Sequence, residues 1–360
     1  MRPPRIFRSM LDVAVLIVCH NGRRHLAECL DSVLASDDGD WGRHIVVVDN
    51  ASTDGSFEFL AANYPQVERI RSDANLGFAG GNNLAWDYAR TAWPGVQYIA
   101  LLNQDTIVRS GWLRALVDYL DTHPVVGAVQ AKVMLHPQTD QFNTAGNGSH
   151  FLGFGFTTGY LQVDHGQFDE PRSIDFPSGA AAMVRARPLR KHGLFDASMF
   201  LYLEDGDLGW KLRQLGYDIA YVPAAVVWHK YTFQSGYRFY FYLERNRWWL
   251  ILTYYKTPSL LLLLPPLVAM EVGQLWFAWR HGVLCEKVRA VAYFFRRANL
   301  LQLATRRSAM QRSRRIGDRA FLEPFAAKIE FPELTSRLLK RVGNPLLCAY
   351  WSVARRLIVW

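Results

Sequence analysis

Cysteine is scarce in this sequence of 360 residues. The four cysteines (Cys19, Cys29, Cys285 and Cys348) lie far apart and form no Cys-x-x-Cys pair. This spacing disfavours a disulfide framework and a zinc site, and it fits a thiol-reduced cytoplasmic setting. Disorder is also disfavoured, because hydrophobic residues make up 50% of the chain and charged residues 20%. Such a chain can bury a substantial core, as one large domain or two smaller ones.

Other familiar signals are absent as well. The first apolar run, Val13–Cys19, has no small-residue cleavage site and leads directly into a polar turn, so we expect a core strand rather than a signal peptide. Two Gly/Asn-rich turns match neither the P-loop nor the Gly-x-Gly-x-x-Gly fingerprint, which disfavours an ATPase or a dinucleotide-binding enzyme. The sequence also contains no internal repeats.

Positive charge is concentrated at one end of the chain. The net charge is +9, but residues 281–360 hold 16 Lys and Arg against 5 Asp and Glu, and the first 280 residues are slightly acidic. A basic tail is typical of proteins that bind either nucleic acid or an anionic membrane surface. No RNA-binding motif accompanies it, so we expect no nucleic-acid partner.

Apolar runs alternate with helical patterns in the first half of the chain. Val13–Cys19, His44–Asp49 and Tyr98–Leu102 are predicted to be buried strands, and Arg24–Ala35 has the apolar spacing of a helix. Repetition of strand and helix predicts an α/β sheet, whose ligands gather at the carboxyl ends of the strands.

Further along, the pattern is less regular. Asn143–Gly159 is predicted to be a flexible loop or a small hairpin. Leu208–Leu215 has helical spacing, Ile219–Val222 is predicted to be a strand, and Pro223–Val227 a loop. We place a catalytic domain at residues 1–240 and a helical, aromatic and basic region at residues 241–360.

The C-terminal region begins with a strongly apolar stretch. Trp248–Trp279 contains only two charged residues, Lys256 and Glu271. Thr257–Trp279 is long enough to cross a bilayer, but Pro265-Pro266 and the glutamate argue equally for a re-entrant or interfacial hairpin.

A second apolar stripe follows at helical spacing, from Leu284 to Gln302, with basic residues beside it. A basic amphipathic helix next to an aromatic belt suits an anionic membrane surface. The alternative is a helical subdomain that packs on the catalytic domain or on a second subunit, which would make a homo-oligomer.

Polar residues follow the predicted strands at the points where they end. Asn103-Gln104-Asp105 comes directly after a strand, where oxygen ligands can hold Mg²⁺ or Mn²⁺. The alternative is an ordinary turn, with Asp105 capping a helix over Trp112–Leu120. Trp228-His229 follows the last core element, so Asp105 and His229 would complete a mixed metal site if they converge.

An acidic segment precedes the predicted helix Leu208–Leu215. Tyr202-Leu203-Glu204-Asp205-Gly206-Asp207 crowds three carboxylates, and one of them could take a proton from an attacking hydroxyl. The alternative is an acidic helix start that complements the helix dipole.

Two turns have the composition of phosphate-binding loops. One follows the second strand, from Asp49 to Gly55, and the other, from Asn75 to Asn83, opens a helix. Glycine permits close backbone approach there, and exposed amides at a helix start favour a phosphate.

Together and in order, these segments resemble the family-2 inverting glycosyltransferases of the GT-A fold. The matching stretches lie between Val13 and His229 and include IVVVDNASTDGS, NLGFAGGNN, LLNQDT, PSGAAAMVRARPL, FLYLEDGDLGWKLRQLGY and VPAAVVWH. The resemblance is greatest to the branch of rhamnosyltransferases and galactofuranosyltransferases of bacterial cell-surface polysaccharides.

The resemblance implies a Rossmann-like nucleotide-diphospho-sugar transferase domain and a role for each site residue. Asp205 corresponds to the catalytic base, with Glu204 beside it, and Asp105 and His229 correspond to ligands of Mg²⁺ or Mn²⁺. Asp49 would hold the uracil or thymine ring or the ribose. The complete set of donor-binding residues is Asn21, Asp49, Asn75, Gly77, Asn103, Gln104 and Gly179. Asn103 stands where many members have Asp, which leaves the metal's identity open.

The implied reaction moves rhamnose or another hexose from a dTDP- or UDP-sugar to a glycan or polyprenyl-lipid-linked acceptor. It would take place at the cytoplasmic face of the inner membrane, on a peripheral or partly inserted enzyme. One alternative is a catalytically silent nucleotide-sugar-binding or scaffold protein, which the presence of Asp105, Asp205 and His229 disfavours. A nucleotidyltransferase is a second alternative, but the turn His20–Arg24 is too short for its basic, glycine-rich loop.

Overall fold

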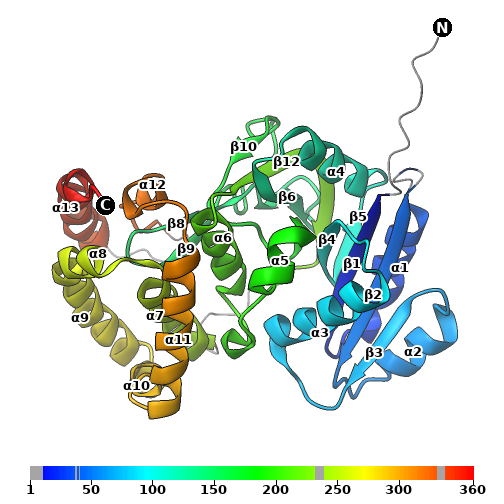
Figure 1. The fold of residues 1–360 in the computed structure, drawn as a ribbon, viewed down its shortest axis with the longest axis horizontal. Helices are drawn as coiled ribbons and strands as arrows, with labels where there is room; N and C mark the ends of the chain where they lie inside the picture. The colour runs from blue at the N-terminus through cyan, green and yellow to red at the C-terminus, as the bar shows by residue number, and fades with distance from the viewer. Residues whose placement is uncertain (1–10, 37–38, 40, 232–238, 331–336) are drawn as a thin grey trace, which may run out of the picture.

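The computed structural model describes residues 11–36, 39, 41–231, 239–330 and 337–360. It has two parts, a large sheet covered by helices and a bundle of helices beside it (Figure 1). Within the described residues, every named strand precedes residue 230, and helices make up most of the chain after residue 239. This organisation is the one expected for an α/β region followed by a helical one.

The sheet is mainly parallel where the site forms. Its strand order is β10-β12-β6-β11-β4-β1-β2-β3, with β5 paired to β12 and β7 paired to β6. β4, β1, β2 and β3 are parallel, and β11 runs antiparallel to both of its neighbours. The strands are β1 Asp12–Cys19, β2 Gly42–Asn50, β3 Glu68–Ser72, β4 Tyr98–Asn103, β5 Thr106–Val108, β6 Val126–Leu135, β7 Phe142–Thr144, β10 Arg172–Ser173, β11 Ala181–Arg185 and β12 Asp218–His229.

Helices cover both faces of this sheet, because its central strands are apolar on both sides. On one face, alternate residues of β1 and β4 pack against α1 (Arg23–Ala35), α2 (Ser56–Asn63) and α4 (Trp112–Thr122). On the other face lie α3 (Gly77–Ala92), α5 (Ala186–His192) and α6 (Glu204–Gln214). The polar loops at the carboxyl ends of the strands remain uncovered by this packing.

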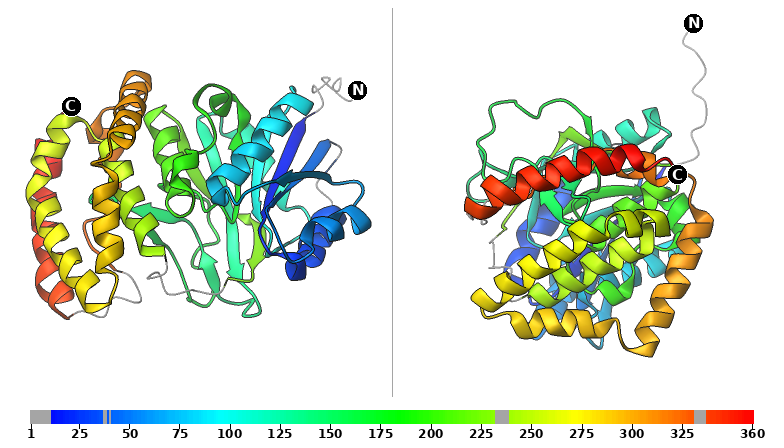
Figure 2. Two further views of the ribbon diagram at one scale, coloured as in Figure 1. Left: turned by 90° about the horizontal axis from the view of Figure 1, so that it is seen from below. Right: turned by 90° about the vertical axis from the view of Figure 1, so that its left-hand side faces the viewer.

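The helical part is joined to the sheet part through a third apolar core. Trp210 of α6 is almost completely buried and stacks on Tyr255, with 5.6 Å between ring centroids. Figure 2 shows the helices of this part stacked beside the sheet. They are α7 Tyr240–Tyr254, α8 Thr257–Leu262, α9 Leu264–Arg280, α10 Leu284–Tyr293, α11 Arg297–Ser313, α12 Asp318–Leu322 and α13 Asn344–Leu357, which follows a π-helical turn, Leu339–Gly343.

Most of the expected helices and strands occur, and several are longer than expected. The strand expected at Ile219–Val222 continues through Pro223 to His229 as β12, and a register shift between Val222 and Val226 accommodates the proline. The expected loop over Pro223–Val227 is therefore wrong. The hairpin within Asn143–Gly159 is confirmed as β8 (Asn147–Ser149) and β9 (Gly155–Thr157).

The helical stripe and the possible membrane span are divided in the structure. The stripe from Leu284 to Gln302 is split between α10 and α11, with a break before Arg297. Thr257–Trp279 is split between α8 and α9 at Leu263, just before the tandem proline. Across the described part of the chain, no helix combines the length and the apolarity needed to span a membrane.

Candidate active site

Polar side chains join the loops that follow β1, β2 and β4 at the carboxyl ends of these strands. The Asn21 side-chain oxygen accepts from the backbone N–H of Thr53 at 2.8 Å, which ties the loop after β1 to the loop after β2. The Gln104 side-chain oxygen accepts from the backbone N–H of His20 at 3.1 Å and ties β4 to β1. Asn21 and Gln104, both predicted to bind the donor, are thus placed at the expected edge of the sheet.

The loop that opens α3 is fixed by a pair of asparagines. Asn50, at the end of β2, donates to the Asn75 side-chain oxygen at 3.1 Å and accepts from the backbone N–H of Leu76 at 2.8 Å. Gly77 adopts φ +70°, and a Cβ there would lie 2.3 Å from the carbonyl oxygen of Phe200. Asn75 and Gly77 therefore shape the turn, and Gly77 does so because only glycine fits under Phe200.

Asp49 is a buried acid whose carboxylate accepts no hydrogen bond from the described residues. It is completely buried at the end of β2, and neither carboxylate oxygen has a hydrogen-bond partner among the described residues. Buried polar groups in folded proteins are nearly always paired, so an unpaired carboxylate at a strand end suggests a missing ligand.

Asp105 and His229 converge, as the sequence predicted. His229 Nε2 lies 3.2 Å from an Asp105 oxygen and 3.3 Å from the side-chain nitrogen of Asn103. Burial alone would raise the pKa of Asp105, but the hydrogen bond and charge of His229 outweigh it, so this pKa lies below its usual value. Asp105 precedes β5, and α4 begins after Gly111, so the alternative of Asp105 as a helix cap is wrong.

A second asparagine orients the histidine ring. The other ring nitrogen of His229, Nδ1, lies 3.0 Å from the Asn143 side-chain oxygen, which can only accept. Nδ1 then donates to Asn143, which leaves Nε2 as the ring nitrogen beside Asp105. A divalent cation that displaced the Nε2 proton could bind both this nitrogen and the carboxylate.

The donor set fits a metal that completes its coordination with substrate oxygens. The described residues contain no cluster of three or more His, Cys, Asp or Glu side chains that could hold a metal ion. Asp105 and His229 would supply two ligands. Mg²⁺ is commonly held by one or two carboxylates together with substrate phosphates, and such a pair would need the same help from substrate oxygens.

The acidic segment forms the first turn of α6. The Asp205 carboxylate accepts hydrogen bonds from the backbone N–H groups of Gly206, at 2.7 Å, and Gly179. Burial raises the pKa of Asp205 to about 6 despite these bonds. Burial and the charge of Asp205 raise the pKa of Glu204 well above its usual value. Burial thus raises the pKa of both neighbouring carboxyl groups, and a carboxyl group with a pKa near neutral pH is typical of acid–base sites.

The backbone before Glu204 is strained. Phe200, Tyr202 and Leu203 adopt φ values of +61°, +66° and +62°, in the left-handed region that disfavours residues other than glycine. Each such residue costs of order 1–3 kcal/mol, and such strain gathers at functional sites. The acidic helix start proposed as the alternative is also observed, so Asp205 occupies a helix N-terminus and a strained loop end together.

A short segment connects Asp205 to the strand end that carries Asp105 and His229. Gly179 donates to Asp205, and the carbonyl oxygen of Ala180 accepts from the backbone N–H of Asn103 at 3.1 Å. Because Gly179 and Ala180 are adjacent, hydrogen bonds through these two residues join Asp205 to Asn103 at the end of β4. A Cβ on Gly179 would approach the Phe78 ring to 2.7 Å, so this link also requires glycine.

Three polar residues at the site were missed by the sequence reasoning. Asn50 was included in a turn without a role, and Asn143 was assigned only to a loop. His25 on α1 interacts electrostatically with both Asp105 and His229, and burial lowers its pKa. The contact of Asn143 with His229 joins residues 86 positions apart, so no local pattern could indicate it.

The mainly parallel α/β sheet carries a carboxylate–histidine pair at its strand ends and a perturbed aspartate at the start of α6, an arrangement that fits a group-transfer enzyme. Residues 11–250 match the family described as "Glycosyltransferase like family 2", which is most of the described sheet region and α7. The chain therefore belongs to glycosyltransferase family 2.

Known relatives agree with this membership. The chain is 28% identical over 212 residues to the N-acetylglucosaminyl-diphospho-decaprenol L-rhamnosyltransferase of Mycobacterium tuberculosis, covering 53% of this chain and 68% of the relative. It is 24% identical to rhamnosyltransferase WbbL of Escherichia coli K12, over 59% of this chain and 81% of the relative. The crystal structure of GalNAc-T7 with UDP, GalNAc and Mn²⁺ has a TM-score of 0.53 and 16% identity, covering 69% of this chain and 49% of that one.

Proposed function

We propose that this glycosyltransferase is inverting and metal-dependent, and that it moves rhamnose or another hexose from a dTDP- or UDP-sugar to an acceptor hydroxyl. The observation that carries the proposal is the link between Asp205, whose pKa is about 6, and the Asp105–His229 pair. Hydrogen bonds through Gly179 and Ala180 join Asp205 to Asn103, whose side chain lies 3.3 Å from His229. The names of the two bacterial relatives support rhamnose, and the mycobacterial one supports an acceptor that is a glycan or a polyprenyl-diphosphate-linked sugar.

The residues would act in a single displacement. The acceptor hydroxyl gives its proton to the Asp205 carboxylate as its oxygen bonds to the anomeric carbon. The bond from that carbon to the diphosphate oxygen breaks, and its electron pair leaves with the nucleoside diphosphate. Attack from the face opposite the leaving group inverts the configuration. Burial and the charge of Asp205 raise the pKa of Glu204, which disfavours a second negative charge beside the base.

The remaining site residues would hold the donor. The unpaired Asp49 carboxylate can accept from the ring N–H of uracil or thymine or from a ribose hydroxyl. Asp105, His229 and the Asn103 amide would hold Mg²⁺ or Mn²⁺, which neutralises charge on a leaving diphosphate. The Mn²⁺ named with GalNAc-T7 is consistent with this choice of ion.

A donor panel tests the proposal. The purified protein is incubated with dTDP-rhamnose, UDP-sugars and GDP-mannose, with Mn²⁺, Mg²⁺ or EDTA, and released nucleoside diphosphate is measured. We expect release from one dTDP- or UDP-sugar that stops with EDTA, and a product of inverted anomeric configuration by NMR. Donor binding without release, with lipid-linked acceptors supplied, would instead support a silent nucleotide-sugar-binding protein.

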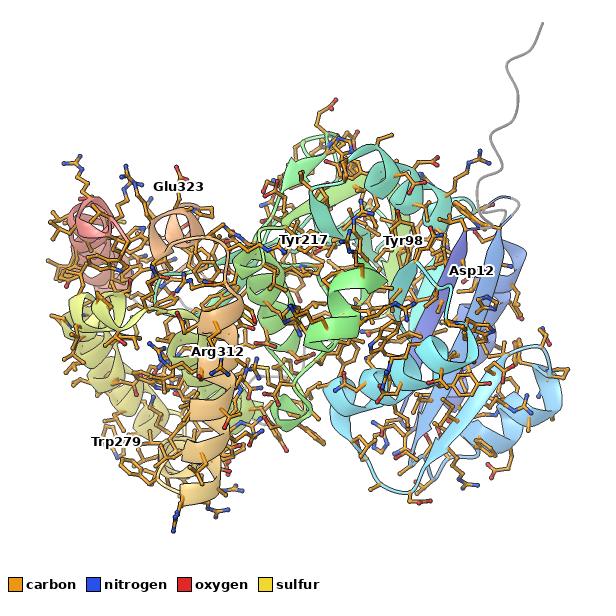
Figure 3. The ribbon with its side chains drawn as sticks, in the orientation of Figure 1. Asp12, Tyr98, Tyr217, Trp279, Arg312 and Glu323 are labelled. Atoms are coloured by element: carbon orange, nitrogen blue, oxygen red, sulfur yellow. The ribbon has the colours of Figure 1, made fainter. Side chains whose placement is uncertain are left out.

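We also propose that the helical part binds the cytoplasmic face of the inner membrane, and this proposal rests on one exposed face. Residues on one side of α9 are apolar yet exposed, namely Leu264, Val268, Val272, Leu275, Trp276 and Trp279. The packed side of α9 buries Leu267 and Ala278, and on it Glu271 forms ion pairs with Arg247 and Lys287. The exposed apolar residues have no such partners among the described contacts. Figure 3 shows Trp279 at the edge of the helical part, away from the sheet.

Charge and composition favour a lipid surface as the partner of this face. Exposed apolar patches of this kind mark interaction sites, and tryptophan is enriched where proteins meet lipid headgroups. Arg280, Arg296 and Arg297 are exposed at the ends of α9, α10 and α11, where they can contact anionic headgroups. A glycosyltransferase with a polyprenyl-linked acceptor would meet that acceptor at the same surface.

Vesicle flotation tests the membrane proposal. We expect the protein to float with phosphatidylglycerol-containing vesicles and less with neutral ones, and the double variant Trp276→Glu/Trp279→Glu to stay in the bottom fraction. Val125→Glu, at another exposed apolar site, serves as the matched control and should float normally. Unchanged flotation of the double variant would contradict the proposal, and a dimer that it dissociates would identify a second subunit as the partner.

A further inference from the structure

The strained loop that carries the catalytic base is held from the helical part. Phe200, Tyr202 and Leu203 keep left-handed φ values that an unrestrained chain would relax. The preceding helical turn, η1 (Ala197–Met199), and this loop lie against α7. Other contacts must therefore compensate for the strain, and α7 provides them.

Asn246 of α7 bonds to the loop backbone at three points. It is 1% exposed, and its side-chain nitrogen donates to the carbonyl oxygens of Met199, Leu201 and Tyr202 at 3.0, 3.1 and 2.7 Å. The carbonyls of Leu201 and Tyr202 thus converge on one amide, together with that of Met199, which also accepts from the backbone N–H of Leu201 at 2.7 Å. Burial of such carbonyls without a donor would cost free energy.

The neighbouring arginine fixes which way this amide points. Arg245 donates from Nε and Nη2 to the Asn246 side-chain oxygen at 2.9 and 2.7 Å, and from Nη2 to the Met199 carbonyl at 2.8 Å. The guanidinium can only donate, so the Asn246 oxygen must face it and the NH₂ group must face the loop. The orientation of the Asn246 side-chain amide is therefore fixed by the donors of Arg245.

A second contact pins both ends of the same segment. Arg306 of α11 bonds to Asp196, which caps η1, and to Asp207, in the first turn of α6. The residues between them are the ones that place Asp205. The loop is thus held in the middle by α7 and at its ends by α11, and all these holding side chains lie outside the sheet part.

We propose that Asn246 is a positioning residue for the catalytic base: it keeps the loop Phe200–Leu203 in its strained form and so keeps Asp205 aimed and shielded from water. This inference rests on the proposed function, in which Asp205 takes the acceptor proton. It makes the helical part a component of the active site.

The first test needs no substrate. Loss of the amide in Asn246→Ala should admit water to Asp205, so that the carboxylate is no longer costly to bury. We expect Asp205→Asn to raise the urea midpoint of the wild-type protein near neutral pH, and to raise it less when combined with Asn246→Ala. The control is Asn299→Ala, which removes one side-chain bond to the Tyr293 carbonyl in the same helical part. When Asp205→Asn is added to this control, the urea midpoint should rise as much as in the wild-type protein. An equal rise in all three backgrounds would overturn the proposal.

The second test uses the donor that the panel identifies. We expect Asn246→Ala to lower kcat by roughly 100-fold with the KM for the donor unchanged, because the reacting group is misplaced while donor binding is not. The acidic limb of the kcat profile should move to lower pH, which a partly unfolded sample would not cause. Asn246→Ser, which keeps one donor, should recover part of the rate and serves if the alanine variant does not fold.

The outcomes separate the two proposals. If Asp205→Asn keeps full activity, the proposed base is wrong whatever Asn246→Ala does. If Asp205→Asn is inactive but Asn246→Ala matches Asn299→Ala in kcat and pH profile, the base is correct and the positioning role is refuted.

Discussion

Replacing Asp205, the proposed base, with asparagine should make the protein more stable while it abolishes activity. Asp205 is half-buried at the start of α6, and burial raises its pKa from 3.8 to about 6. Ionised Asp205 is therefore disfavoured by the folded state, and the isosteric Asp205→Asn removes that penalty. A pKa rise of this size corresponds to about 3 kcal/mol, which is the largest stabilisation that the variant can gain.

The stability difference between Asp205→Asn and wild type should depend on pH. Below about pH 4 the aspartate is protonated in both folded and unfolded chains, so wild type and variant should be equally stable. As pH rises to about 6, the unfolded chain ionises first and wild-type stability falls relative to the variant. Above that pH the difference should stay constant.

Urea unfolding at several pH values measures this difference directly. The variant should have the higher unfolding midpoint near neutral pH and the same midpoint as wild type in acid, with an unchanged dependence on urea. A variant that is less stable at neutral pH, or a gap that does not grow between about pH 4 and 6, would refute the assigned environment of Asp205.

Three further predictions concern the same site. Turnover should fall as pH drops below about 6, because protonated Asp205 cannot accept the acceptor's proton; a pH–kcat profile flat to pH 5 would contradict this. Asn143→Ala should weaken Mn²⁺ binding ~10- to 100-fold, because His229 loses the partner that sets its tautomer, and electron paramagnetic resonance titration of wild type against Asn63→Ala checks it. Gly179→Ala should cost about 1–3 kcal/mol of stability, because its Cβ would meet the Phe78 ring, and an unchanged urea midpoint would show that the ring moves aside.

The parts of the fold that the sequence predicted are those with local signals. Val13–Cys19 and Tyr98–Leu102 are continuous apolar runs, and such runs form buried parallel strands wherever helices cover both faces. The convergence of Asp105 and His229 has a different cause, because β4 and β12 are separated by β6 and β11. β5, which begins directly after Asp105, pairs with the end of β12 and sets His229 opposite Thr106. That pairing has no local sequence signal.

The remaining parts depend on contacts between distant residues. Asn246 reaches carbonyls 44 to 47 positions earlier, and Arg306 reaches Asp196 across 110 positions. Neither contact has a sequence signature, because asparagine and arginine on a helix are usually solvated. The break between α10 and α11 was missed for a related reason, since apolar spacing persists across it while the backbone turns.

The central claim is that Asp205 is the base of a glycosyl transfer, and one comparison tests it most directly. Wild type and Asp205→Asn are compared for nucleoside diphosphate release from the identified donor with Mn²⁺, at matched occupancy by the donor. The account predicts that the variant binds the donor normally and turns it over slower by several orders of magnitude. A variant that works at a rate near that of wild type would contradict the account.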